Sequence, residues 1–323
     1  MKLNDCFTDW FDVTSGVRQG DNLSPTLFGL FINNLAIKIK ALNKGVVVNN
    51  VRVGILLYAD DIVLLAENET DLQDMINCIF DCCQKWRLFI NHGKTKIIHF
   101  RSKRSRRSDY IFKYGEQIIE YTSSYKYLGV IFNEFMNFTS CADALAESSG
   151  RALGGIIAKF KLLKDVGYKT FTKMFEAGVV PIMDYGAGVW GFGKYPSANV
   201  IQNRASRYFM GVHSFAPNPS IHADMGWLLP RYRRYLAIVR LWNHLIRMDS
   251  QRLTKQIFEW DYTMKDNNWS SDIESIFDLL GLQHIFEDRV ECDLELCKHK
   301  LNGLMQTEWE TDVKAKPKLK EYI

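Results

Sequence analysis

The sequence lacks an apolar run of about 18 residues, the length at which a membrane-spanning helix becomes a candidate. It also lacks an apolar signal core near its start, where residues 1–13 read MKLNDCFTDWFDV. Internal repeats and low-complexity tracts are absent as well. These absences argue against a membrane protein and against a repeat or disordered architecture, so we expect no membrane partner.

Cysteine is scarce and irregularly spaced. An odd number of cysteines without regular spacing argues against a disulfide framework and predicts a reducing intracellular setting, in the cytoplasm, the nucleus or both. Cys292, Cys297 and His299 are close in sequence, but no second ligand pair follows them, so they are only a weak indication of zinc. The seven cysteines are Cys6, Cys78, Cys82, Cys83, Cys141, Cys292 and Cys297.

The chain's positive charge is concentrated in its middle. The net charge is +4 over 323 residues, but residues 101–180 and 181–250 each carry +5, whereas residues 251–323 carry −5. A basic middle suits a polyanion such as nucleic acid, although solvated faces could give the same imbalance. With 47% apolar residues the chain can form one large or two modest domains.

The first part of the chain alternates between helical and strand patterns. Ser24 and Pro25 can begin a helix that continues through residues 26–42. Thr70 and Gln73 form a possible capping box before an amphipathic helix over residues 71–89. Between the two helices, VRVGILLYADDIVLLAE predicts a β-hairpin.

The strands TKIIHF and YKYLGVIF follow, separated by the basic loop RSKRSRRSD, and from about residue 139 the pattern is mostly helical. Mixed elements in this order predict an α+β fold, with helices covering one face of a small antiparallel sheet. The other face would stay open to a long ligand.

Asp60 and Asp61 lie side by side at the tip of the predicted hairpin, within an otherwise apolar run. Burying two ionised carboxylates without partners would be costly, so the tip should be exposed. Aspartate is common in turns, and a plain turn is therefore one interpretation. The other is a divalent-metal site, because carboxylate oxygens suit Mg²⁺ and can support two-metal phosphoryl transfer.

Several motifs decide between these interpretations. In order, SGVRQGDNLSPTLFGLFINNL, YADD, INHGKTKIIHF and YKYLGVIF resemble segments of the reverse transcriptases of non-LTR (LINE-type, jockey-like) retrotransposons, and VPIMDYGAGVW and HADMGWLLP resemble the segments that follow their thumb. The resemblance spans about residues 10–230. It implies a partial polymerase palm at residues 1–138, thumb-like helices at 139–180 and a helical post-thumb region at 181–323.

The resemblance also assigns roles to residues of the predicted site. Asp60 and Asp61 would hold two ions of Mg²⁺ or Mn²⁺, and Lys94 would neutralise or protonate the leaving pyrophosphate, although Lys94 could equally be a surface lysine in a turn. The implied partners are an RNA template, a DNA primer and deoxynucleoside triphosphates. The nucleotide and template pocket would contain Arg18, Gln19, Gly20, Tyr58 and Ala59, and the primer grip Leu128 and Gly129.

Basic residues outside this pocket could contact the nucleic-acid backbone through salt-sensitive binding. The basic loop could also be a nuclear address or a solvated loop. The candidates are Arg101, Lys103, Arg104, Arg106, Arg107, Lys159, Lys161 and Lys164. Arg231, Arg233, Arg234 and Arg240 of a later helix could touch nucleic acid or solvate one face.

One feature of the family pattern has no counterpart in the sequence. The family carries another catalytic aspartate on a strand upstream of GVRQG, and Asp5, Asp9 and Asp12 do not match that strand. We therefore expect this chain to be a fragment of an RNA-directed DNA polymerase that does not extend a primer by itself, because the loss of one metal ligand slows such chemistry by roughly a thousandfold or more. The alternatives are a non-catalytic nucleic-acid-binding relic and a relic that never folds.

Overall fold

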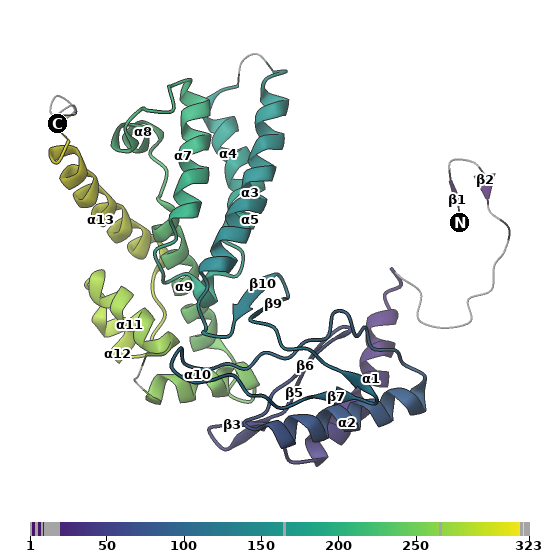
Figure 1. The fold of residues 1–323 in the computed structure, drawn as a ribbon. Helices are drawn as coiled ribbons and strands as arrows, with labels where there is room; N and C mark the ends of the chain where they lie inside the picture. The colour runs from purple at the N-terminus through teal and green to yellow at the C-terminus, as the bar shows by residue number, and fades with distance from the viewer. Residues whose placement is uncertain are drawn as a thin grey trace. The chain divides into compact units, whose positions relative to one another are not determined.

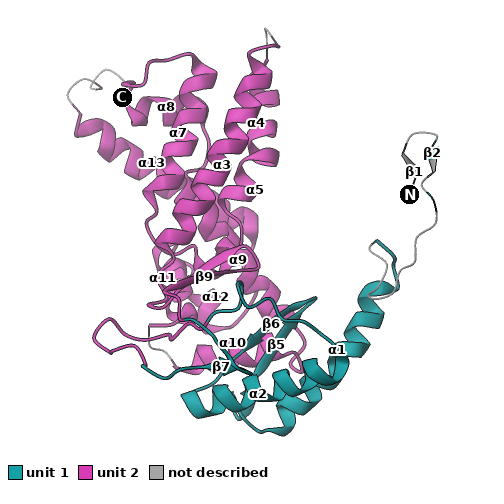
Figure 2. Ribbon diagram, turned by 45° about the vertical axis from the view of Figure 1, so that its right-hand side comes forward, with its two compact units in different colours: residues 1–96, 109–120 teal, residues 97–108, 121–323 magenta. Residues whose placement is uncertain are grey.

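The computed structural model describes residues 2–3, 6–7, 9, 20–163, 166–264, 267–316 and 319. Its contacts divide the chain into two compact units (Figure 2). Unit 1 consists of residues 1–96 and 109–120, and unit 2 of residues 97–108 and 121–323. Residues 97–108, which include all five cations of the basic loop, therefore belong to unit 2, although the residues on either side of them in the sequence belong to unit 1.

Unit 1 combines two helices with short antiparallel ladders (Figure 1). Its helices are α1 (Ser24–Ala41) and α2 (Glu69–Trp86). Its strands are β1 (Lys2–Leu3), β2 (Cys6–Phe7), β3 (Val46–Val48), β4 (Val51–Val53), β5 (Ile55–Tyr58), β6 (Asp61–Leu64), β7 (Lys113–Tyr114) and β8 (Gln117–Ile118).

The core of unit 1 lies between α1 and α2. Leu35 and Ile39 of α1 and Met75 and Ile79 of α2 are buried, at positions four residues apart on each helix. Asn68 caps α2, since its side chain accepts a hydrogen bond from the Asp71 backbone N–H. The cap lies two residues before the predicted one at Thr70.

Gln73 has a different role from the predicted capping partner. Its amide Nε2 donates to the carbonyl of Lys113 at 2.8 Å, and its Oε1 accepts from the Lys113 backbone N–H at 2.9 Å. The side chain thus pairs with β7 as a neighbouring strand would. This contact fixes the β7–β8 hairpin to helix α2.

Unit 2 begins with one hairpin and continues as helices. Its strands β9 (Ser124–Tyr127) and β10 (Val130–Asn133) pair antiparallel, with Tyr127 opposite Val130. The helices are α3 (Thr139–Phe160), α4 (Tyr168–Gly178), α5 (Val180–Met183), α6 (Ala187–Trp190), α7 (Pro196–Met210), α8 (Asn218–Met225), α9 (Pro230–Arg247), α10 (Leu253–Met264), α11 (Trp269–Leu279), α12 (Gln283–Glu287) and α13 (Leu294–Lys314).

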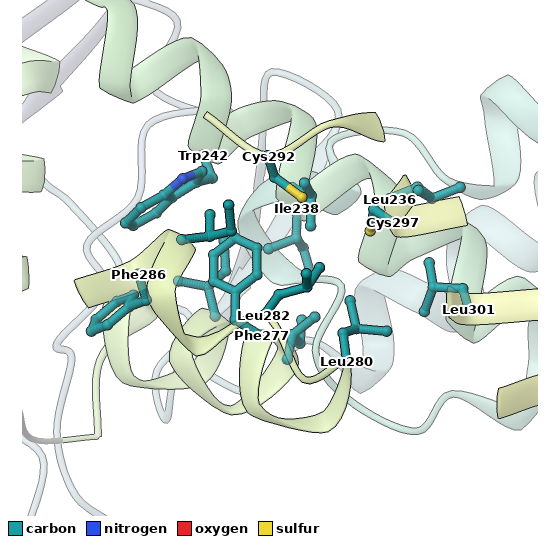
Figure 3. Close-up of a cluster of buried hydrophobic side chains, with 14 of the residues drawn as sticks. Leu236, Ile238, Trp242, Phe277, Leu280, Leu282, Phe286, Cys292, Cys297 and Leu301 are labelled. Carbon is teal, nitrogen blue, oxygen red and sulfur yellow. The ribbon is translucent and has the colours of Figure 1, made fainter. Parts of the chain in front are cut away.

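Two large apolar clusters stabilise unit 2. In one, Phe171 and Phe175 of α4 pack with Leu153 of α3 and with Trp227. In the other, Trp242 of α9 is fully buried among residues of α10 to α13, including Phe277 and Phe286 (Figure 3). Burial of large aromatic side chains on this scale is a dominant favourable term in folding.

The predicted α+β class and the helical character after residue 139 agree with the structure. The prediction of one small sheet was wrong, because the described strands form separate two-stranded ladders. TKIIHF is not a strand either. Ile97 forms a single parallel bridge with Tyr121, and the rest of the segment lies outside any ladder. No helix among the described residues is both long and apolar enough to cross a membrane.

Candidate functional site

The two aspartates lie at the tip of the β5–β6 hairpin, as the sequence predicted. Tyr58 pairs with Asp61, so the turn between the strands consists of Ala59 and Asp60. Ala59 has a positive φ of 50°, which reverses the chain within two residues. Asp60 and Asp61 are both exposed, and neither forms an ion pair with another described residue. Their carboxylates are therefore available to a ligand in solution.

Other predicted pocket residues of unit 1 are also exposed. The Tyr58 side chain, beside the aspartates, is 63% exposed. Gly20 has a φ of 85°, and no atom of the described residues lies within 4 Å of its Cβ position, so its backbone can approach a ligand closely. Lys94 lies in an exposed turn, where its backbone N–H donates to the carbonyl of Asn91. Arg18 and Gln19 lie outside the described residues.

Leu128 and Gly129 form the two-residue turn of the β9–β10 hairpin, where the sequence had predicted a continuous strand. Both have positive φ, 46° and 86°, as a tight hairpin turn of this kind requires. The Tyr185 hydroxyl donates to the carbonyl of Leu128 at 3.1 Å, and its ring covers Gly129. Tyr185 lies in the DYGAGVW motif, and the sequence alone did not connect it with this turn.

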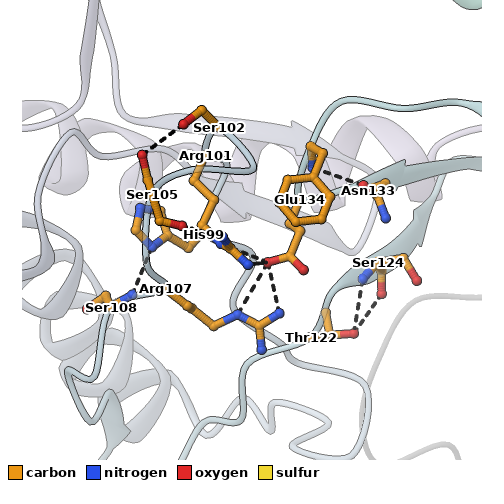
Figure 4. Close-up of polar contacts among 11 residues, drawn as sticks. His99, Arg101, Ser102, Ser105, Arg107, Ser108, Thr122, Ser124, Asn133 and Glu134 are labelled. Atoms are coloured by element: carbon orange, nitrogen blue, oxygen red, sulfur yellow. Dashed lines mark hydrogen bonds and ion pairs between the residues drawn. The ribbon is translucent and has the colours of Figure 1, made fainter.

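The five cations of the basic loop have two different environments (Figure 4). Arg101 and Arg107 both form ion pairs with the buried Glu134, at 3.0 and 2.9 Å. The hydrogen bond from Arg107, together with the charges of both guanidinium groups, lowers the pKa of the Glu134 carboxyl below its ordinary value. Lys103, Arg104 and Arg106 are exposed and form no ion pair within the described part of the chain. Nothing in the sequence around Glu134 indicates its role.

The cations of the helices also differ in their surroundings. Lys159 and Lys161 are exposed at the end of α3, as nucleic-acid contacts would require, and Lys164 lies outside the described residues. Arg233 of α9 forms an ion pair with Asp184, and Arg234 is buried, with its guanidinium donating to the carbonyls of Gly191 and Gly193. Neither of these two arginines is a solvated surface cation.

No group of three or more potential metal ligands occurs among the described residues. Cys292 and Cys297 are buried in the core of unit 2, whereas His299 is exposed. The Asp60–Asp61 pair contributes two carboxylates to a candidate metal site, one fewer than such a group of three. Mg²⁺ commonly binds one or two carboxylates and completes its shell with water and substrate phosphates, and two exposed carboxylates fit that pattern.

The segment that contains this hairpin matches a known protein family, and the chain is similar to several known proteins. Residues 2–132 match the reverse transcriptase (RNA-dependent DNA polymerase) family. The chain is 31% identical over 140 residues to the retrovirus-related Pol polyprotein from type-1 retrotransposable element R2 of Nasonia vitripennis, which covers 39% of the chain and 13% of the relative.

Two further relatives match a longer part of the chain. The RNA-directed DNA polymerase from mobile element jockey of Drosophila funebris is 25% identical over 66% of the chain. The Pol polyprotein from type-1 retrotransposable element R1 of Bradysia coprophila is 24% identical over 70% of the chain. The chain spans only 13–24% of the length of these three relatives. Residues 2–132 thus match the reverse transcriptase family, and the chain is similar to proteins of the retrotransposable elements R2, jockey and R1.

Proposed function

We propose that the β5–β6 hairpin is the metal-binding tip of an RNA-directed DNA polymerase site. The observation that carries this proposal is the pair of exposed, adjacent carboxylates of Asp60 and Asp61 on a two-residue turn, within the segment that matches the reverse transcriptase family. In this assignment residues 1–138 belong to the palm, 139–180 to the thumb and 181–323 to the region after it.

The reaction proposed for the complete site, which by the family pattern includes a further aspartate, is nucleotidyl transfer, and we expect the residues of this chain alone not to extend a primer. The 3′-oxygen of a DNA primer attacks the α-phosphorus of a deoxynucleoside triphosphate, a new O–P bond forms, and the bond to the β-phosphate breaks to release pyrophosphate. Bound Mg²⁺ or Mn²⁺ would offset phosphate charge and favour ionisation of the attacking hydroxyl. Asp60 and Asp61 would hold the cations through their carboxylate oxygens.

Other residues of the chain would position the substrates. Lys94 would offset charge on the departing pyrophosphate, and its exposed turn leaves the ammonium group free to do so. Tyr58, Ala59 and Gly20, with Arg18 and Gln19, would line the nucleotide and template pocket. In unit 2, the Leu128–Gly129 turn, supported by Tyr185, would contact the primer strand.

Metal binding can be tested on the chain itself. Mn²⁺ binding, followed by its electron paramagnetic resonance signal, should weaken at least tenfold in Asp60→Asn and in Asp61→Asn. Asp81→Asn is a matched control, because Asp81 is an exposed carboxylate on α2 that lies away from the hairpin tip in sequence. Equal Mn²⁺ affinity in the wild type and both tip variants would rule out the site.

Substrate binding provides a second readout. An RNA template annealed to a DNA primer should bind the chain, and a matching deoxynucleoside triphosphate with Mn²⁺ should strengthen that binding in the wild type but not in Asp60→Asn. A second candidate function, nucleic-acid binding without catalysis, is favoured by the three exposed cations of the basic loop. Binding that responds neither to Mn²⁺ nor to Asp60→Asn would support this second function.

A further inference from the structure

Residues 101–108 of the basic loop are folded around one buried carboxylate, Glu134, which directly follows strand β10. One carboxylate oxygen of Glu134, Oε2, accepts hydrogen bonds from Arg101 Nε at 3.1 Å and from Arg107 Nη2 at 2.9 Å. The Arg101 guanidinium also lies over the ring of Phe135 at 4.8 Å. The two ends of the loop are thus joined through a single side chain (Figure 4).

Backbone and hydroxyl contacts fix the loop further. The Arg101 backbone N–H donates to the carbonyl of Glu134 at 2.9 Å, so main chain and side chain of the same residue hold this end. The Ser108 N–H donates to His99 Nδ1 at 3.0 Å. Inside the loop, the hydroxyls of Ser102 and Ser105 share a hydrogen bond of 2.9 Å. All of these residues belong to unit 2.

This arrangement divides the five cations into two that are paired with Glu134 and three that are exposed. Arg101 and Arg107 are half-buried and both pair with Glu134, so the three groups together carry a net charge of only +1 and their guanidinium groups are engaged inside the chain. Lys103, Arg104 and Arg106 lie between them in sequence and are exposed. A loop that is ordered before binding loses less conformational entropy when a ligand docks than a flexible basic tail would.

We propose that Glu134 is a positioning residue that holds Lys103, Arg104 and Arg106 as a preformed site for the backbone phosphates of a nucleic-acid strand. This role rests on the nucleic-acid binding proposed above, to which these residues of unit 2 would contribute. Residues 101–108 include no aromatic side chain on which a base could stack. The site should therefore contact phosphates without reading sequence.

The salt dependence of binding tests the site. With an RNA–DNA hybrid duplex as the probe, the combined variant Lys103→Ala, Arg104→Ala, Arg106→Ala should reduce the slope of log K against log salt by about 2 to 3, or roughly 0.7–0.9 for each lost phosphate contact. A control variant, Lys85→Ala, Lys298→Ala, Lys314→Ala, removes the same charge from exposed positions elsewhere. An equal loss of slope in both variants would overturn the proposal.

Neighbouring arginines test the division of the loop. Arg106→Met should lower the salt slope by about 0.9, because it removes an exposed cation that displaces counterions from the duplex. Arg107→Met should leave the slope nearly unchanged, because the Arg107 guanidinium is engaged with Glu134 and is not one of the proposed phosphate contacts. Reversed behaviour of the two variants would contradict the assignment.

Glu134→Gln separates positioning from simple attraction. The variant raises the net charge by one and frees two arginines, so attraction alone predicts tighter binding. Loss of the ordered loop predicts binding about three- to tenfold weaker, the equivalent of ordering one or two side chains. Tighter or unchanged binding by folded Glu134→Gln would overturn the role of Glu134. The Arg106 and Arg107 variants test the same division without altering the buried carboxylate.

The nature of the partner can be determined in the same assay. If the wild type does not bind the hybrid duplex, the proposed nucleic-acid function itself fails. If the wild type binds but the triple loop variant binds with the same salt slope, only the present inference fails. Poly-glutamate can be compared with unlabelled duplex as a competitor, at equal concentrations of carboxylate and phosphate. If poly-glutamate displaces the labelled duplex equally effectively, the partner is an acidic protein and the choice of nucleic acid is overturned.

Discussion

The phenol of Tyr185 donates a hydrogen bond of 3.1 Å to the carbonyl of Leu128, 57 residues earlier in the chain. The same ring lies so close to Gly129 that a Cβ there would be 2.7 Å from Tyr185 Cε1. The tyrosine of the DYGAGVW motif thus supports the turn proposed as the primer grip. The turn depends on glycine both for its positive φ and for this close approach.

Gly129→Ala should therefore destabilise unit 2 by about 2 kcal/mol, from backbone strain at positive φ and the clash with Tyr185. Gly211→Ala is the matched control, since Gly211 has a φ of 65° but no described atom within 4 Å of its Cβ position. The control should lose only about 1 kcal/mol, because it has the strain without the clash. Urea unfolding measures both values, and equal losses would show that the tyrosine ring yields freely.

The ion pair between Arg233 and Asp184 fixes helix α9 to the residue before Tyr185. The two groups are 2.8 Å apart, and their side chains are only 17% and 11% exposed. Asp184→Ala would leave the Arg233 charge in a largely dry environment, so we expect a loss of about 3 kcal/mol. Glu147→Ala removes an exposed pair with Arg151 and should cost at most about 0.5 kcal/mol. Similar losses in urea unfolding for the two variants would contradict the importance of burial.

Trp227, in the HADMGWLLP motif, stacks on Phe175 of α4 with ring centroids 4.4 Å apart. Its indole N–H donates to the Thr172 hydroxyl at 3.1 Å. Trp227→Ala should cost about 3 to 5 kcal/mol, because it creates a cavity in the apolar cluster beneath α4. Thr172→Val removes only the hydrogen-bond acceptor and should cost about 1 kcal/mol. Thermal and urea unfolding of both variants would separate packing from hydrogen bonding, and a larger loss in Thr172→Val would reverse this interpretation.

The parts of the fold that sequence predicts well are local. The β5–β6 hairpin follows from apolar runs on both sides of Ala59, and the spacing of Met75 and Ile79 indicates the buried face of α2. The failed predictions involve distant partners. Gln73 pairs with Lys113, forty residues away, and a rule for helix caps cannot anticipate that contact. Ile97 forms one isolated bridge with Tyr121, and this single bridge is too little to make TKIIHF a strand.

The candidate site shows the same limit. Adjacent aspartates and glycines can be read in the sequence because chemistry and turn geometry restrict those residue types. The exposure of an arginine cannot be predicted from the sequence in this way, because it depends on where the acidic partner lies in the folded chain. Arg101 and Arg107 contact Glu134, 33 and 27 residues away, although in the sequence they belong to the same basic run as Arg106.

His222 of α8 provides a prediction on pH. Its Nε2 lies 2.7 Å from the amide oxygen of the buried Asn203. Burial lowers the pKa of the imidazole below its ordinary value of 6.5. The nearby charges of Arg207 and Lys316 lower the pKa further, and Asp312 acts in the opposite sense. The folded protein therefore binds this proton less readily than the unfolded chain does.

The sign of the effect follows from that difference. Above pH 6.5 the imidazole is mostly neutral in both states, so His222 adds no pH dependence. As the pH falls below 6.5, the unfolded chain takes up the proton first, and the free energy of unfolding should decrease until the folded pKa is passed. His222→Gln should reduce this decrease between pH 7.5 and 5.5, measured by urea unfolding at each pH. A variant with the same pH dependence as the wild type would show that other groups cause it.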